Sequence, residues 1–251
     1  MLMAISAGKC RAGPRETENG KREAPVSLVF RLPFPVSRLG YSSRVPFITF
    51  EGVEGSGKST QLELAAERLG AAGRPVRATR EPGGTAIAER IREILMDARH
   101  AELDPMTEWL LIEAARRQHL AEIVRPALDA GVYLLCDRFC DSTEAYQVAG
   151  RGLDEGMVRG LDLRVRDGLS PDLTLVYDLD PREGLARAKS RDAGEGRFES
   201  AALAFHERVR DAFLAIARRE PERVAVVPVR GDAVAVFADT WRILSARFGL
   251  A

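Results

Sequence analysis

Five short apolar runs, separated by longer segments with helical periodicity, constrain the fold of this chain most strongly. The runs lie between residues 45 and 229 and read VPFITFE, PVRAT, VYLLCD, LTLVYDLD and RVAVVPV. Near-continuous apolar runs are typical of strands covered on both faces, as in a parallel sheet. Helices are expected at residues 58–73, 84–97, 105–130 and 232–248. This alternation predicts an α/β protein, with a five-stranded parallel sheet and helices on both of its faces.

Composition excludes several classes of partner. The formal net charge of the 251 residues is zero, so no overall field attracts nucleic acid or an anionic membrane. The apolar runs are far shorter than the about 20 residues that a membrane-spanning helix needs. Cys10, Cys136 and Cys140 lack the paired spacing of a disulfide framework or a zinc site. We therefore expect a cytoplasmic protein with neither a nucleic-acid nor a membrane partner.

The first 44 residues differ from the rest in charge and pattern. They hold eight of the 37 Lys and Arg residues and three of the 37 Asp and Glu residues, so residues 1–44 carry +5 and residues 45–251 carry −5. They lack the long apolar region of a secretory signal, and they contain glutamates that a transit peptide normally avoids. We expect a disordered or dispensable leader at residues 1–44 and one folded domain at residues 45–251.

Polar segments leave the first three predicted strands. They begin at Glu51, Arg80 and Asp137 and read EGVEGSGKS, REPGGT and DRFCDSTEAYQ. Because ligands bind at the carboxyl ends of the strands in an open α/β sheet, these segments are expected to meet at one edge and build one site.

The first of these segments matches the phosphate-loop pattern G-x-x-x-x-G-K-S/T between a strand and a helix. Its glycines allow successive N–H groups to converge on phosphate oxygens, and the helix N-terminus adds partial positive charge. Lys58 supplies a charge for the β- and γ-phosphates, and the Ser59 hydroxyl can bind Mg²⁺. The expected ATP-binding residues are Gly52, Val53, Glu54, Gly55, Ser56, Gly57, Lys58, Ser59 and Thr60.

The third segment supplies a candidate metal ligand and a candidate phosphate ligand. Asp137 ends an apolar run, where a carboxylate can reach the metal directly or through water. Arg138 follows it and suits a second phosphate, since guanidinium groups make paired bonds to phosphate oxygens. The chain contains neither the N-K-x-D nor the D-x-x-G motif of switch GTPases. The missing motifs argue against a switch GTPase, whereas the phosphate loop alone does not distinguish a motor ATPase from a small-molecule kinase.

In their order and spacing, five segments resemble the bacterial thymidylate kinase family. They read FEGVEGSGKSTQ, REPGGT, EAARRQH, DRFCDSTEAYQVAGRG and PDLTLVYDLDP, and the resemblance runs from about Val45 to the C-terminus. It implies a P-loop NTPase three-layer sandwich with a short lid, and transfer of a phosphoryl group from ATP to dTMP with Mg²⁺ as cofactor. It also implies a homodimer, to which the helix containing TEWLLIEAARRQHLAEIV could contribute, although a core-facing role for that helix is equally consistent with the sequence.

The resemblance implies which residues bind dTMP. Arg116 and Arg138 match arginines that hold the dTMP phosphate, whereas Thr143 and Gln147 match positions at the thymine edge. Tyr146 matches a tyrosine against the deoxyribose, where its bulk disfavours a 2′-hydroxyl. The alternative to phosphate binding for Arg116 is a solvated position on a helix surface. The alternative to nucleotide contact for Thr143, Tyr146 and Gln147 is an ordinary polar position on a helix surface.

Three further positions border the same pocket by resemblance. Glu54 matches an acidic residue near the 3′-hydroxyl of the acceptor sugar, and Pro82 belongs to a tight turn beside the pocket. Ile112 departs from the family, which usually has an aromatic residue there that stacks on thymine. Ile112 and Arg116 lie one helical turn apart on the same face, so an aliphatic wall is expected to replace the ring.

A lid is expected at about residues 189–199, where Arg191 and Arg197 flank a glycine-containing segment. By resemblance these arginines stabilise the transferred phosphoryl group, and together with Lys58 and Arg138 they are the expected catalytic residues. The family's usual Asp-Arg pair reads Gly196-Arg197 in this chain. No general base is needed, because the acceptor phosphate is already ionised at neutral pH.

Two other functions stay open from the sequence. A different P-loop nucleotide or deoxynucleoside kinase would use the same phosphate loop, although paired arginines suit a phosphate-bearing acceptor better than a neutral sugar. A non-catalytic nucleotide-binding protein would be favoured if Ile112 and Gly196 reflected decay of the site.

Overall fold

The computed structural model describes residues 45–100, 102–189 and 201–250 of the chain. The predicted leader, residues 1–44, and residues 190–199 of the predicted lid lie outside these described residues. Five parallel strands form one sheet in the order β2-β3-β1-β4-β5. The strands are β1 (Phe47–Glu51), β2 (Val76–Arg80), β3 (Tyr133–Asp137), β4 (Leu173–Asp178) and β5 (Val224–Pro228). Each strand overlaps one predicted apolar run, so the predicted parallel sheet is confirmed.

Helices connect the strands. They are α1 (Lys58–Ala71), α2 (Ala86–Met96), α3 (Pro105–His119), α4 (Arg125–Asp129), α5 (Cys140–Thr143), α6 (Glu155–Val165), α7 (Pro181–Lys189), α8 (Leu203–Arg219) and α9 (Ala233–Phe248), with a 3-10 turn η1 (Ala98–His100) and π-helical turns η2 (Leu120–Val124) and η3 (Glu144–Gly150). Side chains cap several N-termini: Thr85 accepts from the Ala88 N–H at α2, and Asp232 accepts from the Ala235 N–H at α9. Such caps satisfy backbone donors that a helix leaves unpaired.

The predicted helix at residues 105–130 is continuous but not uniform. It comprises α3, η2 and α4, with Pro126 in the first turn of α4. Proline has no N–H to donate to the carbonyl four residues earlier, and the π-helical turn η2 lies just before it. Helix α6 was not predicted from the sequence.

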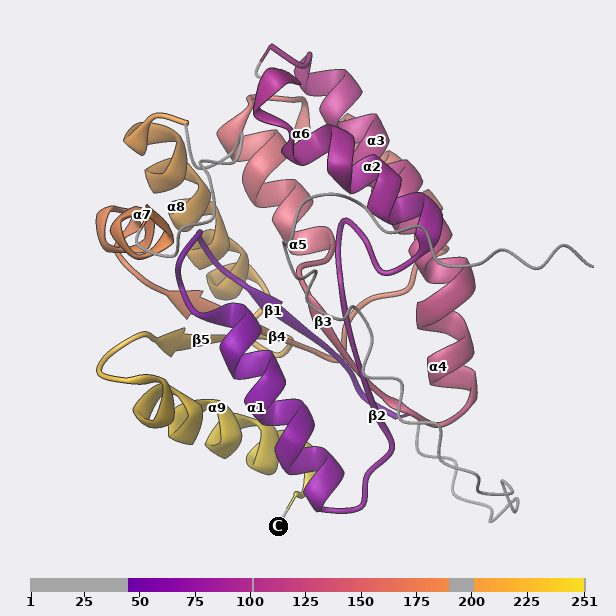
Figure 1. Ribbon diagram of the computed structural model, residues 1–251, viewed down its shortest axis with the longest axis vertical. Coiled ribbons are helices and arrows are strands. Elements are labelled where there is room, and N and C mark those ends of the chain that lie inside the picture. Colours follow the sequence, from indigo (N-terminus) through magenta and orange to yellow (C-terminus); the bar gives the residue numbers. More distant parts are fainter. Residues whose placement is uncertain (1–44, 101, 190–200, 251) are drawn as a thin grey trace, which may run out of the picture. The chain divides into compact units, whose positions relative to one another are not determined.

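Helices cover both faces of the sheet (Figure 1), with α1 and α9 together on one face and α4 and α8 on the other. Side chains that alternate along each strand contribute to separate hydrophobic clusters on the two faces of the sheet. Ile48 and Phe50 of β1 belong to the cluster under α1 and α9, whereas Phe47 belongs to the cluster under α4. Successive side chains of a strand point to opposite faces, so the near-continuous apolar runs serve two cores at once.

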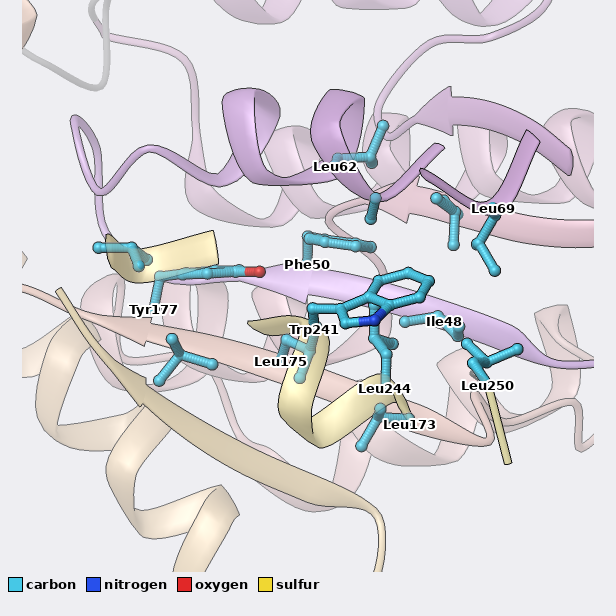
Figure 2. Packing of buried hydrophobic residues seen from close by; sticks show 14 residues of the cluster. Ile48, Phe50, Leu62, Leu69, Leu173, Leu175, Tyr177, Trp241, Leu244 and Leu250 are labelled. Carbon is cyan, nitrogen blue, oxygen red and sulfur yellow. The ribbon is translucent and has the colours of Figure 1, made fainter. Parts of the chain in front are cut away.

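The core under α1 and α9 is built from aromatic and aliphatic side chains (Figure 2). Phe50 of β1 and Tyr177 of β4 stack with ring centroids 6.1 Å apart. Trp241 and Leu244 of α9 pack in the same cluster, with Leu62 of α1. This packing holds α1, and therefore the loop before it, against the carboxyl end of β1.

All five residues of the central strand β1 are buried between β3 and β4. The phosphate loop therefore leaves the middle of the sheet at its carboxyl edge, where ligands bind in open α/β folds. Among the described helices, none has the length and apolar character needed to cross a membrane.

Candidate functional site

The phosphate loop after β1 depends on glycines with positive φ angles. Gly52, Gly55 and Gly57 have φ of 138°, 70° and 84°. A Cβ atom on Gly55 would lie 2.0 Å from the backbone oxygen of Gly184, and one on Gly52 would lie 2.6 Å from that of Tyr177. The loop therefore packs directly on the backbone of β4 and α7, which only glycine permits. Of the other predicted loop residues, Val53 and Ser56 are buried and Thr60 is exposed on α1.

Lys58 begins α1 and turns back over the loop. Its Nζ donates to the Val53 carbonyl oxygen at 2.9 Å, and Ser56 Oγ lies 3.5 Å away. Burial and the positive charge of Arg138 lower the pKa of Lys58 below its usual value, against the opposing effect of Glu54. The ammonium group therefore lies inside the loop, where the anionic oxygens of a phosphate would stabilise its charge.

Ser59 and Asp137 form the part of the site that fits a magnesium ion. The Ser59 hydroxyl donates to Asp137 Oδ2 at 2.6 Å, and Asp137 Oδ1 is buried without a hydrogen-bond partner among the described residues. Hydroxyl and carboxylate oxygens are ligands that Mg²⁺ prefers. The described residues contain no cluster of three or more His, Cys, Asp or Glu side chains able to hold a metal. Mg²⁺ commonly takes one or two carboxylates and completes its shell with water and phosphate, so the fit rests on the Ser59 hydroxyl and the Asp137 carboxylate.

Arg138 projects from a left-handed corner at the end of β3. Its φ is 70°, and its backbone N–H donates to the Phe50 carbonyl oxygen. Nη1 donates to the Gly52 carbonyl oxygen and to Ser142 Oγ, both at 3.1 Å, and Nη2 donates to Glu54 Oε2 at 3.1 Å. Burial lowers the pKa of Arg138, but the neighbouring Tyr146 and Glu54 outweigh this effect and raise it, so the guanidinium stays charged.

The guanidinium of Arg138 also lies over the ring of Tyr146, 4.9 Å from its centroid. Burial raises the pKa of Tyr146 to about 12, so its hydroxyl stays neutral at physiological pH. The ring packs against Phe205 and Phe213 of α8. Arg138 thus packs on the face of the Tyr146 ring, and Tyr146 belongs to the hydrophobic core.

Arg116 is a buried arginine with most of its donors already used. It is 1% exposed, and its bonds run to Glu81 (Nε to Oε2, 2.8 Å), Glu113 (Nη1 to Oε1, 2.7 Å), Asp162 (Nη1 to Oδ1, 3.0 Å) and Thr143 (Nη2 to Oγ1, 2.9 Å). A guanidinium has five N–H donors. With these bonds in place, Arg116 has one donor, on Nη2, to offer a ligand.

Glu81 anchors the turn that follows β2. Besides the bond from Arg116, its Oε1 lies 2.8 Å from His119 Nδ1, and His119 Nε2 lies 2.7 Å from Thr79 Oγ1. Burial raises the pKa of Glu81, but the charge of Arg116 and the hydrogen bond with His119 outweigh it and leave the pKa lowered. A Cβ atom on Gly84 would lie 2.8 Å from His119. His119 is therefore a buried bridge between α3 and the turn.

One cleft brings the predicted acceptor residues together with the phosphate loop and the metal ligands. It is lined by Glu54, Lys58, Ser59, Arg80, Glu81, Pro82, Arg92, Leu95, Met96, Ile112, Arg116, Asp137, Arg138, Phe139, Ser142, Thr143, Tyr146 and Gln147. All eight residues predicted to bind dTMP are among them. The predicted lid arginines, Arg191 and Arg197, lie outside the described residues.

Arg92 is a cleft residue that the sequence analysis missed. Its Nη1 donates to the Pro82 carbonyl oxygen at 3.0 Å, and burial followed by the charge of Arg80 lowers its pKa. On α2 it shares a face with Ala88 and Leu95, which are fully buried. The sequence did contain a signal for this position, because Arg92 is an arginine on the apolar face of an amphipathic helix, where a charged side chain suggests a functional role.

Comparison with known proteins shows the family to which the chain belongs. Residues 50–238 match the family model described as thymidylate kinase. The chain is 50% identical over 202 residues to a thymidylate kinase of Magnetococcus marinus, covering 80% of this chain and 96% of that protein. It is 48% identical over 209 residues to one of Syntrophotalea carbinolica, covering 81% and 97%. The crystal structure of thymidylate kinase from Ehrlichia chaffeensis is similar with a TM-score of 0.66 and 35% identity, covering 80% of this chain and all of that one.

The contacts of the phosphate loop predict unequal effects of alanine at two of its glycines. Gly55→Ala and Gly57→Ala each place a side chain at positive φ, which costs about 1 kcal/mol. Gly55→Ala must in addition push Gly184 away, whereas a Cβ on Gly57 meets nothing within 4 Å. Thermal unfolding without nucleotide should give a clearly lower Tm for Gly55→Ala than for Gly57→Ala. Equal Tm values would contradict the packing of the loop on α7.

Proposed function

We propose, because the chain belongs to the thymidylate kinase family, that it transfers the γ-phosphoryl group of ATP to dTMP, yielding dTDP and ADP. The observation that carries the proposal is one cleft lined by Lys58 of the phosphate loop and by Arg138 after β3. The chain has no net charge, so these local cations supply the attraction for two phosphate groups.

On the donor side, residues 52–60 hold the ATP phosphates. The loop N–H groups and Lys58 meet the β- and γ-phosphates. Ser59 and Asp137 hold Mg²⁺, which supplies neutralisation of charge on the phosphate oxygens when bound. The orphaned Oδ1 of Asp137 supports this assignment.

On the acceptor side, Arg138 and Arg92 bind the dTMP phosphate. Arg138 keeps its charge, and both guanidinium groups line the cleft. Arg116 is better suited to the base than to the phosphate, because its one remaining donor matches a carbonyl oxygen and its neighbour Thr143 was assigned to the thymine edge. Gln147, which by resemblance also contacts the thymine edge, lines the same cleft.

Two further side chains complete the acceptor site. Tyr146 lies under Arg138, beside the position proposed for the deoxyribose. Glu54 accepts from Arg138 and also lines the cleft, which suits a role near the 3′-hydroxyl. Pro82 borders the pocket, and its carbonyl oxygen is held by Arg92.

The rate comes from positioning and charge neutralisation, not from proton abstraction. The acceptor phosphate is already an anion, so the cleft needs cations that hold two nucleotides in line. Lys58 and Arg138 supply them in the described cleft, and Arg191 and Arg197 are the residues that we propose to meet the transferred group. We place the reaction in the cytoplasm, where free thiols such as those of Cys136 and Cys140 persist.

A direct assay tests the acceptor. With Mg²⁺ and ATP, the enzyme should show its highest kcat/KM for dTMP when dTMP, dUMP, AMP, CMP and GMP are compared by ADP release. Equal or better turnover of another monophosphate would reject the thymidylate assignment. Binding of ATP and dTMP by calorimetry without any product would instead support a non-catalytic nucleotide-binding protein.

The phosphate loop provides the control for this assay. Lys58→Ala removes the charge inside the loop and should lower kcat by about 100-fold or more, while circular dichroism stays that of the folded protein. Undiminished turnover would remove Lys58 from the catalytic site.

The aliphatic wall at Ile112 predicts a gain of affinity on restoring an aromatic ring. Ile112→Phe should stack on the base and strengthen dTMP binding by about 1 kcal/mol, or about fivefold in Kd. Isothermal titration calorimetry measures this, with Val234→Phe on exposed α9 as the matched control. Unchanged or weaker binding by Ile112→Phe would show that the base does not lie against α3.

A homodimer is the proposed assembly. Exposed apolar side chains gather on α2, α3 and α6, which lie side by side in Figure 1. They are 39–55% exposed and comprise Ile87, Ile94, Leu110, Met157 and Leu163. Exposed apolar patches commonly mark sites of association, and a second copy of the chain presents the same surface.

Light scattering after size-exclusion chromatography tests this assembly. The wild type should have twice the 27.5 kDa mass of one chain, and Leu110→Glu should shift it toward the monomer. Val234→Glu places the same charge at a position 73% exposed on α9 and should leave the mass unchanged. A monomeric wild type would rule out the dimer.

A further inference from the structure

Glu51 is a fully buried carboxyl group at the end of β1, directly before the phosphate loop. Its Oε1 accepts hydrogen bonds from the backbone N–H groups of Phe139 at 2.7 Å and Ser142 at 3.3 Å. Its Oε2 accepts from the Ser142 hydroxyl at 2.6 Å. Glu51 does not line the described cleft. Contact with a nucleotide therefore does not explain why a carboxyl group is buried here, although burying one is costly unless it is well bonded.

Ser142 connects Glu51 to Arg138. A serine hydroxyl has one hydrogen to donate, and Ser142 directs it at Glu51. Its oxygen therefore presents lone pairs to Arg138, whose Nη1 donates to it at 3.1 Å. The bond to Glu51 thus sets the direction of the acceptor that the guanidinium meets.

Glu51 also holds the corner from which Arg138 projects. The φ of 70° at Arg138 is rare for residues other than glycine. Such a conformation persists where surrounding contacts impose it. On one side of the corner Asp137 pairs with Phe50 in the sheet, and on the other side the Phe139 N–H donates to Glu51.

We propose that Glu51 is a positioning residue for Arg138: its carboxylate holds the segment 139–142 and, through Ser142, aims the guanidinium into the cleft. The inference rests on the proposed function, in which Arg138 binds the phosphate of dTMP. Glu51 acts through protein atoms alone and needs no contact with either nucleotide.

The charge of Glu51 makes this role sensitive to pH. Burial and the negative charge of Asp141 raise its pKa to about 7, against the opposing charge of Arg138. The other titratable groups that interact with Glu51 are Lys58 of α1, Cys136 of β3 and Tyr146 of η3. The ionised carboxylate accepts these three hydrogen bonds more strongly than the protonated acid does, because hydrogen bonds to a charged acceptor are about twice as strong as those to a neutral one. Arg138 should be held best above pH 7 and progressively less well as the pH falls through about 7.

Glu51→Gln tests the role by steady-state kinetics with dTMP and Mg-ATP. We expect kcat/KM for dTMP to fall about 10- to 100-fold, as for a misplaced binding group. We also expect the acidic limb near pH 7 in the profile of kcat/KM to disappear. Asp172→Asn is the matched control, because Asp172 also accepts a backbone N–H, from Phe47 at 2.7 Å, but at the opposite end of β1. It should keep the wild-type kcat/KM and pH profile.

A double-mutant cycle with Arg138→Ala separates this inference from the proposed function. If Arg138→Ala keeps wild-type kinetics for dTMP, the proposed acceptor site is wrong. If Arg138→Ala loses activity, Glu51→Gln should add little to that loss, because both act through one group. Equal losses from Glu51→Gln in both backgrounds, or wild-type kinetics in the single variant, would overturn the positioning role.

Ser142→Ala keeps the test decisive if Glu51→Gln fails to fold in thermal unfolding measurements. It removes the connection to Arg138 but leaves the bond from the Phe139 N–H to Glu51. We expect a higher KM for dTMP in a folded protein, and little further loss when Ser142→Ala is added to Arg138→Ala, because Ser142 itself lines the cleft and only a connection through Arg138 makes the two effects non-additive. A KM equal to that of the wild type would refute the connection through Ser142.

Discussion

The parallel pairing of β1 with β3 is the constraint on which the whole site depends. In this register Phe50 lies beside Asp137, so the phosphate loop and the Arg138 corner leave the sheet at the same edge. Backbone hydrogen bonds extend the pairing beyond the strands: the Arg138 N–H donates to Phe50, and the Glu81 N–H donates to Asp137. The donor half and the acceptor half of the cleft are therefore joined through the sheet itself, and neither is an independent loop.

Buried charge networks then divide the cations of the cleft into two kinds. Arg116 is held by three carboxylates and a hydroxyl, and burying such a charge is tolerable because it is paired and four of its five donors are hydrogen-bonded. Among the residues that the structure describes, Arg138 makes one ion pair, at 3.1 Å, with Glu54 in the cleft wall. The first arginine is therefore part of the framework with one donor to spare, whereas the second lines the cleft and is the one proposed to bind the acceptor phosphate.

A second hydrogen-bond network holds the segment 139–142 through Asp141. Asp141 accepts from Arg223 at 2.7 and 2.8 Å and from the Thr174 hydroxyl at 3.0 Å. These contacts connect the amino-terminal ends of β4 and β5 to the segment that Glu51 holds. The negative charge of Asp141 also contributes to the raised pKa of Glu51, so the framework and the site are electrostatically coupled.

By itself the sequence determined the parallel sheet and the phosphate loop, because near-continuous apolar runs and a glycine-lysine-serine pattern are local signals. It did not predict α6, in which Val158 and Asp162 are the buried residues and Gly156 and Gly160 weaken the helical signal. It also missed Arg92, and it could not tell which donors of Arg116 remain available. Only the tertiary structure decided these points, because the partners of a buried guanidinium come from segments far apart in the chain, here the turn after β2, α5 and α6.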